Sequence, residues 1–303
     1  MNEDHQSYLW RDIAAGTNYS DKFEINSFRM PGKANSHLAS WEPRELSLRW
    51  YRTFLNLAAS SSSFYVKELF TKFQNEISLG SPVTNRIELA LGGGWVDVNL
   101  DYLLTFEELE FLLPQLVDNP IKTICEIGAG FGRFAHILLN LKPEIKSYYV
   151  FDLPATLNIC KNYLVRIMDP ELFKKVIFVD VTLGKVVNQD FDLAIQIDGL
   201  QEMNSYSIEK YFEIFSRAKM FYSKNVVAKY LPETAGILDI TGKVPFDLGK
   251  SKSIVDIWKK DDLIAPTEEH AIAYTPIGHI VKSKLSCRLF PHYLNLFTVQ
   301  KNN

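Results

Sequence analysis

Ile124-Cys-Glu-Ile-Gly-Ala-Gly-Phe-Gly-Arg133 is the stretch of sequence that decides the fold. The apolar residues over Thr123 to Ile127 predict a short buried strand that carries Glu126 at its end. Glycines follow at alternate positions, so the backbone can turn sharply and approach a ligand closely. A helix that begins after them would offer unpaired N–H donors. The stretch therefore predicts a strand, a loop that binds a nucleotide-type cofactor, and a helix.

The residues that follow repeat the order of short apolar strand, turn and helix. This repetition is typical of an α/β domain built on a parallel sheet. The predicted strands are Thr123 to Ile127, Ser147 to Phe151, Val176 to Val179, Leu193 to Ile197, Val226 to Lys229 and a final strand over Tyr293 to Val299. The predicted helices are Phe131 to Leu141, Ala155 to Ile167, and Ser207 to Ala218, the last with Ser205 or Ser207 as its N-cap.

The sequence changes character near residue 120. Before it, Glu45 to Ala59, Phe64 to Ile77 and Phe106 to Leu116 carry apolar residues at three- and four-residue spacing, which is typical of amphipathic helices. The glycines within Leu91 to Leu100 indicate a turn or a close backbone approach. We therefore divide the chain into a helical region over residues 1–118, on the acceptor side of the site, and an α/β domain over residues 119–303.

The spacing of the glycines distinguishes two classes of cofactor. A dinucleotide fingerprint, G-x-G-x-x-G, would need its third glycine where this chain has Arg133. A bulky side chain at that position would prevent close packing of the helix on the strand, which disfavours a nicotinamide cofactor. A tight turn without any ligand remains the alternative, with the acidic residues at the strand ends acting as helix caps.

The arrangement E-x-G-x-G-x-G resembles motif I of the class I S-adenosylmethionine-dependent methyltransferases. The resemblance implies a Rossmann-like sheet that is parallel except for a terminal antiparallel strand, with S-adenosylmethionine as the cofactor. Asp152 and Asp180 close the second and third predicted strands, where carboxylates would accept from the cofactor ribose and adenine amino group. The residues implied to bind the cofactor are Glu126, Gly128, Gly130, Gly132, Arg133, Asp152, Leu153, Asp180, Val181 and Asp198.

Two further segments are similar to a narrower family. Tyr149-Val-Phe-Asp-Leu-Pro-Ala-Thr-Leu157 and Gly199-Leu-Gln-Glu-Met203, followed by a helix that carries Tyr211 and Phe212, resemble the sugar O-methyltransferases of bacterial surface polysaccharide pathways. The resemblance implies that the acceptor is a sugar hydroxyl in polysaccharide or glycoconjugate biosynthesis, free or linked to a nucleotide or lipid. O-methylation of a non-sugar natural product and a silent, cofactor-binding partner subunit are the alternatives.

Methyl transfer to a hydroxyl benefits from a general base near the carboxyl end of the fourth strand, which faces the methyl group in this architecture. Asp198 and Glu202 lie there in the sequence. His270, with His279 and His292, falls in C-terminal loops that we expect to close over the acceptor. We predict Asp198, Glu202 and His270 as the catalytic candidates. Alternatively, Asp198 binds only the cofactor amino group, Glu202 makes a structural contact, and the histidines have no chemical role.

Charge and composition exclude several classes of function. The chain has 33 basic and 36 acidic side chains, a net charge of −3, and no block of like charges, so we expect no nucleic-acid partner. No apolar run is long enough to span a membrane, and the first residues lack a basic signal region, so we expect a cytoplasmic protein without an integral membrane segment. The cysteines and histidines lack metal-ligand spacing, and we predict no metal. A homodimer is compatible with the sequence.

Overall fold

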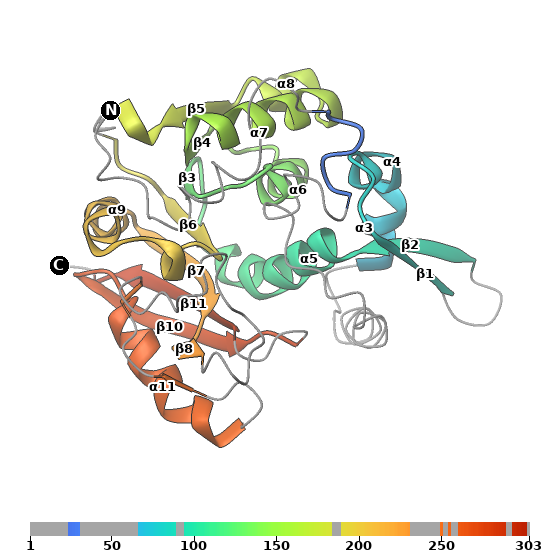
Figure 1. Ribbon diagram of the computed structural model, residues 1–303. Coiled ribbons are helices and arrows are strands. Elements are labelled where there is room, and N and C mark those ends of the chain that lie inside the picture. The colour runs from blue at the N-terminus through green and yellow to red at the C-terminus, as the bar shows by residue number, and fades with distance from the viewer. Residues whose placement is uncertain are drawn as a thin grey trace.

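A seven-stranded sheet organises the chain (Figure 1). The structure is a computed structural model that describes residues 24–30, 66–88, 94–183, 189–230, 249–250, 254–255, 260–288 and 293–301. The strands lie in the order β10-β11-β7-β6-β3-β4-β5. They are β3 (Thr123–Ile127), β4 (Ser147–Asp152), β5 (Val176–Asp180), β6 (Leu193–Ile197), β7 (Met220–Val226), β10 (His279–Ser286) and β11 (Tyr293–Gln300).

The strand directions confirm the predicted fold class. Neighbouring strands from β7 through β6, β3 and β4 to β5 pair in parallel. Strand β11 is antiparallel to both β7 and β10 and lies between them. The sheet is therefore parallel except for β11, which is also the last of these strands along the sequence.

The order of the strands reverses beside β3. From β3 the chain moves to β4 and β5 on one side and then returns to β6 on the other side. In open α/β sheets, ligands bind outside the carboxyl ends of the strands at such a reversal. The fold thus places the end of β3, and the glycine loop that follows it, at the position where a ligand is expected.

Helices cover both faces of the sheet. On one face lie α5 (Leu100–Leu112), α6 (Arg133–Leu141) and α7 (Pro154–Ile167), and on the other lie α9 (Ser205–Arg217) and α11 (Lys260–Ala273) (Figure 1). Side chains alternate along each strand, so Ile124 joins the core cluster under α5, α6 and α7 whereas Cys125 joins the cluster under α9 and α11. A short helix α8 (Pro170–Phe173) precedes β5. Two-residue strands, β8 (Lys229–Tyr230) and β9 (Ile254–Val255), pair separately from the main sheet.

Five of the predicted strands and the three helices predicted between them have their predicted positions within two residues. Strands β3 and β6 have the predicted bounds, and β4 and β5 each extend one residue further, to Asp152 and Asp180. Helix α7 begins at Pro154, whose missing N–H costs nothing in the first turn of a helix. The predicted N-cap of α9 was wrong, because the side chain of Asn204 accepts the N–H of Ser207.

The strand predicted over Val226 to Lys229 was wrong. Strand β7 lies earlier, over Met220–Val226, and all but its last residue are buried. Its second half contains Ser223, Lys224 and Asn225, which break the apolar run that marked the other strands. Lys224 and Asn225 are nevertheless buried because distant side chains bind them: Glu108 accepts from Lys224, and Asn225 donates to Gln196.

The N-terminal region contains a β-hairpin that the helical pattern did not predict. Strands β1 (Thr84–Glu88) and β2 (Trp95–Asn99) pair antiparallel beside the short helices α3 (Val66–Lys72) and α4 (Gln74–Ser78). Helix α5 starts six residues before the predicted Phe106, where Asn99 caps it by accepting the N–H of Tyr102. The helix predicted over Glu45 to Ala59 lies outside the described residues. Where this region ends, at residue 118 or elsewhere, stays a prediction.

A buried arginine ties helix α5 to the segment over residues 24–30, and a pair of tyrosines ties it to α7. The guanidinium of Arg29 donates to the carboxylate of Asp101 on α5 at 2.6 Å, and both side chains are fully buried. It also donates to the side chain of Asn99. Next to it, the hydroxyl of Tyr102 lies 2.8 Å from that of Tyr163 on α7. Residues before the glycine loop are thus an integral part of the same core. No helix in the described part of the chain is long and apolar enough to cross a membrane.

Candidate functional site

The loop between β3 and α6 adopts left-handed backbone conformations. Gly128, Gly130 and Gly132 have φ values of 74°, 58° and 91°, a region that residues with a Cβ rarely adopt. The N–H of Gly128 donates to the carbonyl of Phe151 at 2.9 Å, which ties the loop to the end of β4. A Cβ at Gly132 would lie 2.8 Å from the sulfur of Cys160 on α7. Glycine is required at position 132 by both the backbone angle and this close approach.

Glu126 lies behind the glycine loop and is only 2% exposed. Its carboxylate accepts a hydrogen bond from the hydroxyl of Tyr148 at 2.7 Å. Burial raises the pKa of Glu126 to about 7, although the bond from Tyr148 and the charge of Arg133 oppose this rise. The position suits a residue that supports the loop from the core side, and contact between Glu126 and the cofactor stays a prediction.

The variant Glu126→Gln should change how stability depends on pH. Because the pKa of Glu126 is raised to about 7 in the folded state, its contribution to stability is present below its unfolded pKa and is lost as the pH rises towards 7. Over that range the wild type should lose on the order of 3 kcal/mol relative to the variant, which has no proton to release. Thermal unfolding followed by circular dichroism between pH 4.5 and 7.5 measures the difference in Tm.

The exposed Glu171→Gln serves as the control for this prediction, because the side chain of Glu171 is 77% exposed beside Lys174. Its Tm should follow that of the wild type at every pH. If the Tm of Glu126→Gln also follows the wild type throughout, Glu126 does not titrate in this range.

Asp152 ends β4 next to the loop. One carboxylate oxygen accepts the N–H of Gly130 at 3.2 Å, and the other accepts the N–H of Leu153 at 2.8 Å. Burial raises the pKa of Asp152 to about 7, and these N–H bonds, with one from the hydroxyl of Thr156, oppose the rise. The half-buried side chain therefore joins the glycine loop to the start of α7, whose N-cap is Leu153.

Asp180 ends β5 beside Asp152. The two residues are register partners in β4 and β5, so they occupy neighbouring positions at the carboxyl edge of the sheet. One carboxylate oxygen of Asp180 accepts the N–H and the hydroxyl of Thr182 at 2.8 and 2.7 Å. Val181 begins the short helix η5 (Val181–Leu183) at the same place. Asp180 thus holds the turn of η5, which is close to the capping role of the alternative, whereas Asp152 does not cap α7. Each carboxylate keeps a lone pair for a further hydrogen bond.

Asp198 follows β6 in a strained backbone conformation. Its φ is 56°, which is uncommon for a residue with a side chain, although aspartate adopts it more readily than most. Its N–H donates to the carbonyl of Lys224 at 2.7 Å, and the next two N–H groups, of Gly199 and Leu200, donate to the side chain of Asn225. Strand β7 therefore fixes this turn. The side chain of Asp198 is exposed, as a residue that meets a substrate must be.

The same turn places Glu202 close to Asp198 along the chain. Glu202 ends the short helix η6 (Leu200–Glu202), and its N–H donates to the carbonyl of Gly199 at 3.1 Å. The side chain of the following residue, Met203, reaches towards the glycine loop, with its methyl carbon 3.9 Å from where a Cβ of Gly128 would lie. Residues that follow β6 therefore approach the loop that follows β3.

A buried ionic cluster lies beneath these turns, and the sequence did not reveal it. Glu108 on α5 accepts two hydrogen bonds from Arg133, at 2.7 and 2.9 Å, and one from Lys224 on β7, at 2.7 Å. The two cations lower the pKa of Glu108 against the opposing effect of its burial. Arg133 was predicted as a cofactor ligand, but both of its terminal nitrogens donate to Glu108, and a contact with the cofactor stays a prediction.

His270 and His279 lie in a helix and a strand and not in loops, so the prediction was wrong for these two. His270 is on α11 and fully buried, its ring packs on Tyr274 with centroids 4.4 Å apart, and neither ring nitrogen has a hydrogen-bond partner among the described residues. Burial lowers the pKa of His270 to about 4. His279 begins β10, where its partner is Gln300, at the edge opposite the carboxyl ends of the parallel strands. His292 lies outside the described residues.

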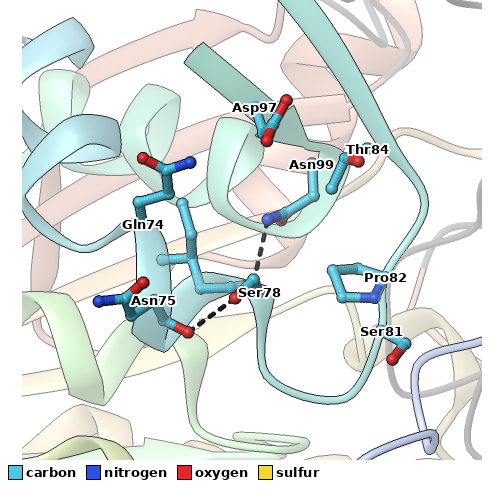
Figure 2. Close-up of a pocket in the computed structure, with 9 residues that line it drawn as sticks. Gln74, Asn75, Ser78, Ser81, Pro82, Thr84, Asp97 and Asn99 are labelled. Atoms are coloured by element: carbon cyan, nitrogen blue, oxygen red, sulfur yellow. Dashed lines mark hydrogen bonds between the residues drawn. The ribbon is translucent and has the colours of Figure 1, made fainter.

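A separate open pocket of about 320 Å³ lies in the N-terminal region (Figure 2). Residues of α4, β1 and β2 and the turn between α4 and β1 line it, among them Asn75, Thr84 and Asp97. None of its lining residues comes from the glycine loop or from the strand ends of the main sheet. Within the described ranges, no group of three or more His, Cys, Asp or Glu side chains is arranged to hold a metal ion.

Comparison with known proteins gives distant matches among solved structures. No family model and no curated protein matches the sequence. The methyltransferase domain of bacterial CtHen1 is 14% identical, with 65% of this chain and 100% of that chain covered and a TM-score of 0.45. Magnesium protoporphyrin IX methyltransferase from Synechocystis PCC 6803 with bound SAH is 15% identical, with 66% and 85% covered and a TM-score of 0.43.

A third structure, the glycopeptide N-methyltransferase MtfA in complex with S-adenosyl-L-methionine, is 11% identical, with 65% of this chain and 94% of that chain covered and a TM-score of 0.42. Sequence identities and TM-scores as low as these say nothing about what this chain binds or modifies. The case for its function therefore rests on its own residues.

Proposed function

We propose that this protein transfers a methyl group from S-adenosylmethionine to a hydroxyl group. The observation that carries the proposal is the juxtaposition of Asp152 and Asp180 at neighbouring strand ends with a glycine loop that leads directly into α6. The reversal of strand order beside β3 puts this arrangement where open α/β sheets bind their ligands.

The residues present suit this cofactor. Asp152 is half-buried and accepts two backbone N–H groups and the hydroxyl of Thr156. One ribose hydroxyl would use the remaining lone pair, and the other would replace the bond from Thr156. Asp180 and the backbone of Val181 would meet the adenine ring one strand further out. Gly128 and Gly130 allow the cofactor to lie against the backbone without a side chain between them.

When bound, S-adenosylmethionine supplies a methyl carbon activated by a positively charged sulfur. The protein must then hold the acceptor hydroxyl in line with that carbon and take its proton. Asp198 is exposed, is held rigidly by β7, and follows the central strand β6. We assign the base to Asp198 or Glu202 in preference to His270, because the His270 ring is fully buried.

We infer a sugar acceptor from the two segments that resemble sugar O-methyltransferases. Both lie at the carboxyl edge of the sheet: one forms the end of β4 and the start of α7, and the other forms the turn that contains η6. They therefore contribute to the region in which an acceptor would meet the cofactor. A cytoplasmic location would give such an enzyme access to nucleotide-linked sugars.

The test is calorimetric titration of the protein with S-adenosylmethionine, S-adenosylhomocysteine and NAD. Binding of the first two, and not of NAD, supports the proposal. A radiolabelled methyl group would then be followed from the cofactor into monosaccharides, nucleotide sugars and phenols. Transfer to phenols alone would overturn the sugar assignment, and cofactor binding without transfer to any acceptor would indicate a silent partner subunit.

Asp198→Asn and Glu202→Gln separate the two candidate bases. Loss of a general base lowers turnover by about 100-fold to 10,000-fold, and neither variant should weaken S-adenosylmethionine binding by more than a few-fold. The measurement is the rate of methyl transfer at saturating cofactor, with calorimetry on the same samples. Unchanged turnover in both variants would mean that neither residue is the base.

A further inference from the structure

A single buried carboxylate connects the residues around the proposed cofactor loop with those around the proposed base. Glu108 lies on α5, outside the α/β sequence pattern, and its side chain is 1% exposed. Arg133, which binds it through both terminal nitrogens, is the first residue of α6 and directly follows Gly132. Lys224, which binds it from the other side, is in β7 and 2% exposed.

The Arg133 side of this cluster fixes the start of α6. One nitrogen of Arg133 also donates to the hydroxyl of Thr105 at 2.5 Å and to the carbonyl of Asp101 at 3.3 Å. These acceptors and Glu108 lie on one face of α5, so the arginine runs along that face. Helix α6, and with it the glycine loop, cannot shift without breaking these bonds.

The Lys224 side fixes Asp198 in two ways. The carbonyl of Lys224 accepts the N–H of Asp198 at 2.7 Å, which holds the strained turn. The ammonium group also acts on the Asp198 carboxylate by charge, and the ammonium needs a partner to remain protonated when it is buried. Glu108 is that partner, at 2.7 Å.

We propose that Glu108 is a positioning residue: it holds Arg133 under the glycine loop and Lys224 beside Asp198, and so places cofactor and base relative to each other. The proposal rests on the proposed function, because it assigns Asp198 to the acceptor side. It adds a role for the helical region, whose helix α5 supplies the shared carboxylate.

Charged groups from three elements and a hydroxyl from a fourth act on Asp198. Lys224 on β7 and Arg133 on α6 favour its ionised form, as does a hydrogen bond from Tyr293 on β11, whereas Glu108 on α5 disfavours it. The largest effect is the loss of water around the carboxylate, which disfavours the ionised form and raises the pKa of Asp198. Removing Lys224 and removing the charge of Glu108 should therefore move the titration of Asp198 in opposite directions.

The test is a carbon NMR titration of protein labelled at the aspartate carboxyl carbons, with Asp198→Asn to identify the signal. In Lys224→Met the Asp198 midpoint should move to higher pH by about 1 unit or more, because the cation that most favours its ionised form is gone. In Glu108→Gln it should move to lower pH, because a repelling charge is removed. Lys219→Met, which breaks an exposed ion pair with Asp192, is the matched control and should leave the midpoint unchanged.

Glu108→Gln leaves two buried cations without a carboxylate and can fail to fold. In that case the double variant Glu108→Gln/Lys224→Met is compared with Lys224→Met, and its midpoint should lie at lower pH. Midpoints that are equal, or that move in the same direction in both single variants, overturn the proposal.

Cofactor affinity provides the second readout. Because Arg133 depends on Glu108 and not on Lys224, S-adenosylmethionine binding should weaken by about 10-fold or more in Glu108→Gln, or in the double variant, and change little in Lys224→Met. Equal loss in both would overturn the role of Glu108 at the loop. A wild type that binds no S-adenosylmethionine would refute the proposed function, whereas the titration of Asp198 would still decide whether Glu108 and Lys224 set its charge.

Discussion

Asp152→Ala is expected to weaken S-adenosylmethionine binding by about 100-fold or more. Each hydrogen bond to a charged group is worth about 1.5 to 3 kcal/mol, and the proposed site uses two of them to hold the ribose. The variant also removes the acceptor for the N–H of Gly130, so the glycine loop loses one of its fixed points. Calorimetric titration of the variant and the wild type measures the change in Kd.

Asp192→Ala is the matched control for this experiment. Asp192 directly precedes β6 and likewise accepts two backbone N–H groups, those of Lys122 and Thr123. These donors lie at the start of β3, at the edge of the sheet opposite the glycine loop. The loss of Asp192 should lower stability and leave cofactor affinity unchanged. Binding by Asp152→Ala that is as tight as in the wild type would remove Asp152 from the site.

Gly132→Ala should give the largest loss of stability of any conservative substitution in the loop. The residue has a φ of 91°, where a side chain costs about 1 to 2 kcal/mol. Its Cβ would also lie 2.8 Å from the sulfur of Cys160 and 3.0 Å from carbons of Leu164, and such overpacking costs about 1 to 3 kcal/mol more. The Tm in thermal unfolding should therefore fall by several degrees.

Gly94→Ala distinguishes the two contributions. Gly94 has a φ of 84°, similar to that of Gly132, but a Cβ there would meet no atom within 4 Å. Only the backbone cost remains, so its Tm should fall by less than half as much. Equal losses in both variants would mean that the contact with α7 contributes nothing.

The sequence predicted the part of the sheet whose strands are plainly apolar. Strands β3 and β6 were placed correctly because both are buried on two faces and contain few polar side chains. Strand β7 is equally buried, but the polar residues in its second half disguised it. Glu108, the partner of Lys224, is more than a hundred residues away in sequence, and no local pattern reveals such a pair.

The ionic cluster at the site also depends on contacts between distant residues. The glycines and the acids at strand ends are local features, and the sequence shows them together. Helix α5 is buried on almost every side, including Asp101, Thr105 and Glu108, so its first half has no amphipathic period to recognise. The link between this helix and Arg133 depends on tertiary packing, and the hydrogen bonds of Lys224 could not be foreseen once β7 had been misplaced.

The position of β11 has a consequence for how the molecule is made. Strand β7 is complete at residue 226, but its neighbour β11 begins only at residue 293, and β10 joins the sheet through β11. During synthesis, therefore, the backbone edge of β7 stays uncovered while the next 66 residues are added. Such an open edge can pair with other chains. We expect the growing polypeptide to be most prone to aggregation in this interval and to depend on chaperones until β11 has emerged from the ribosome.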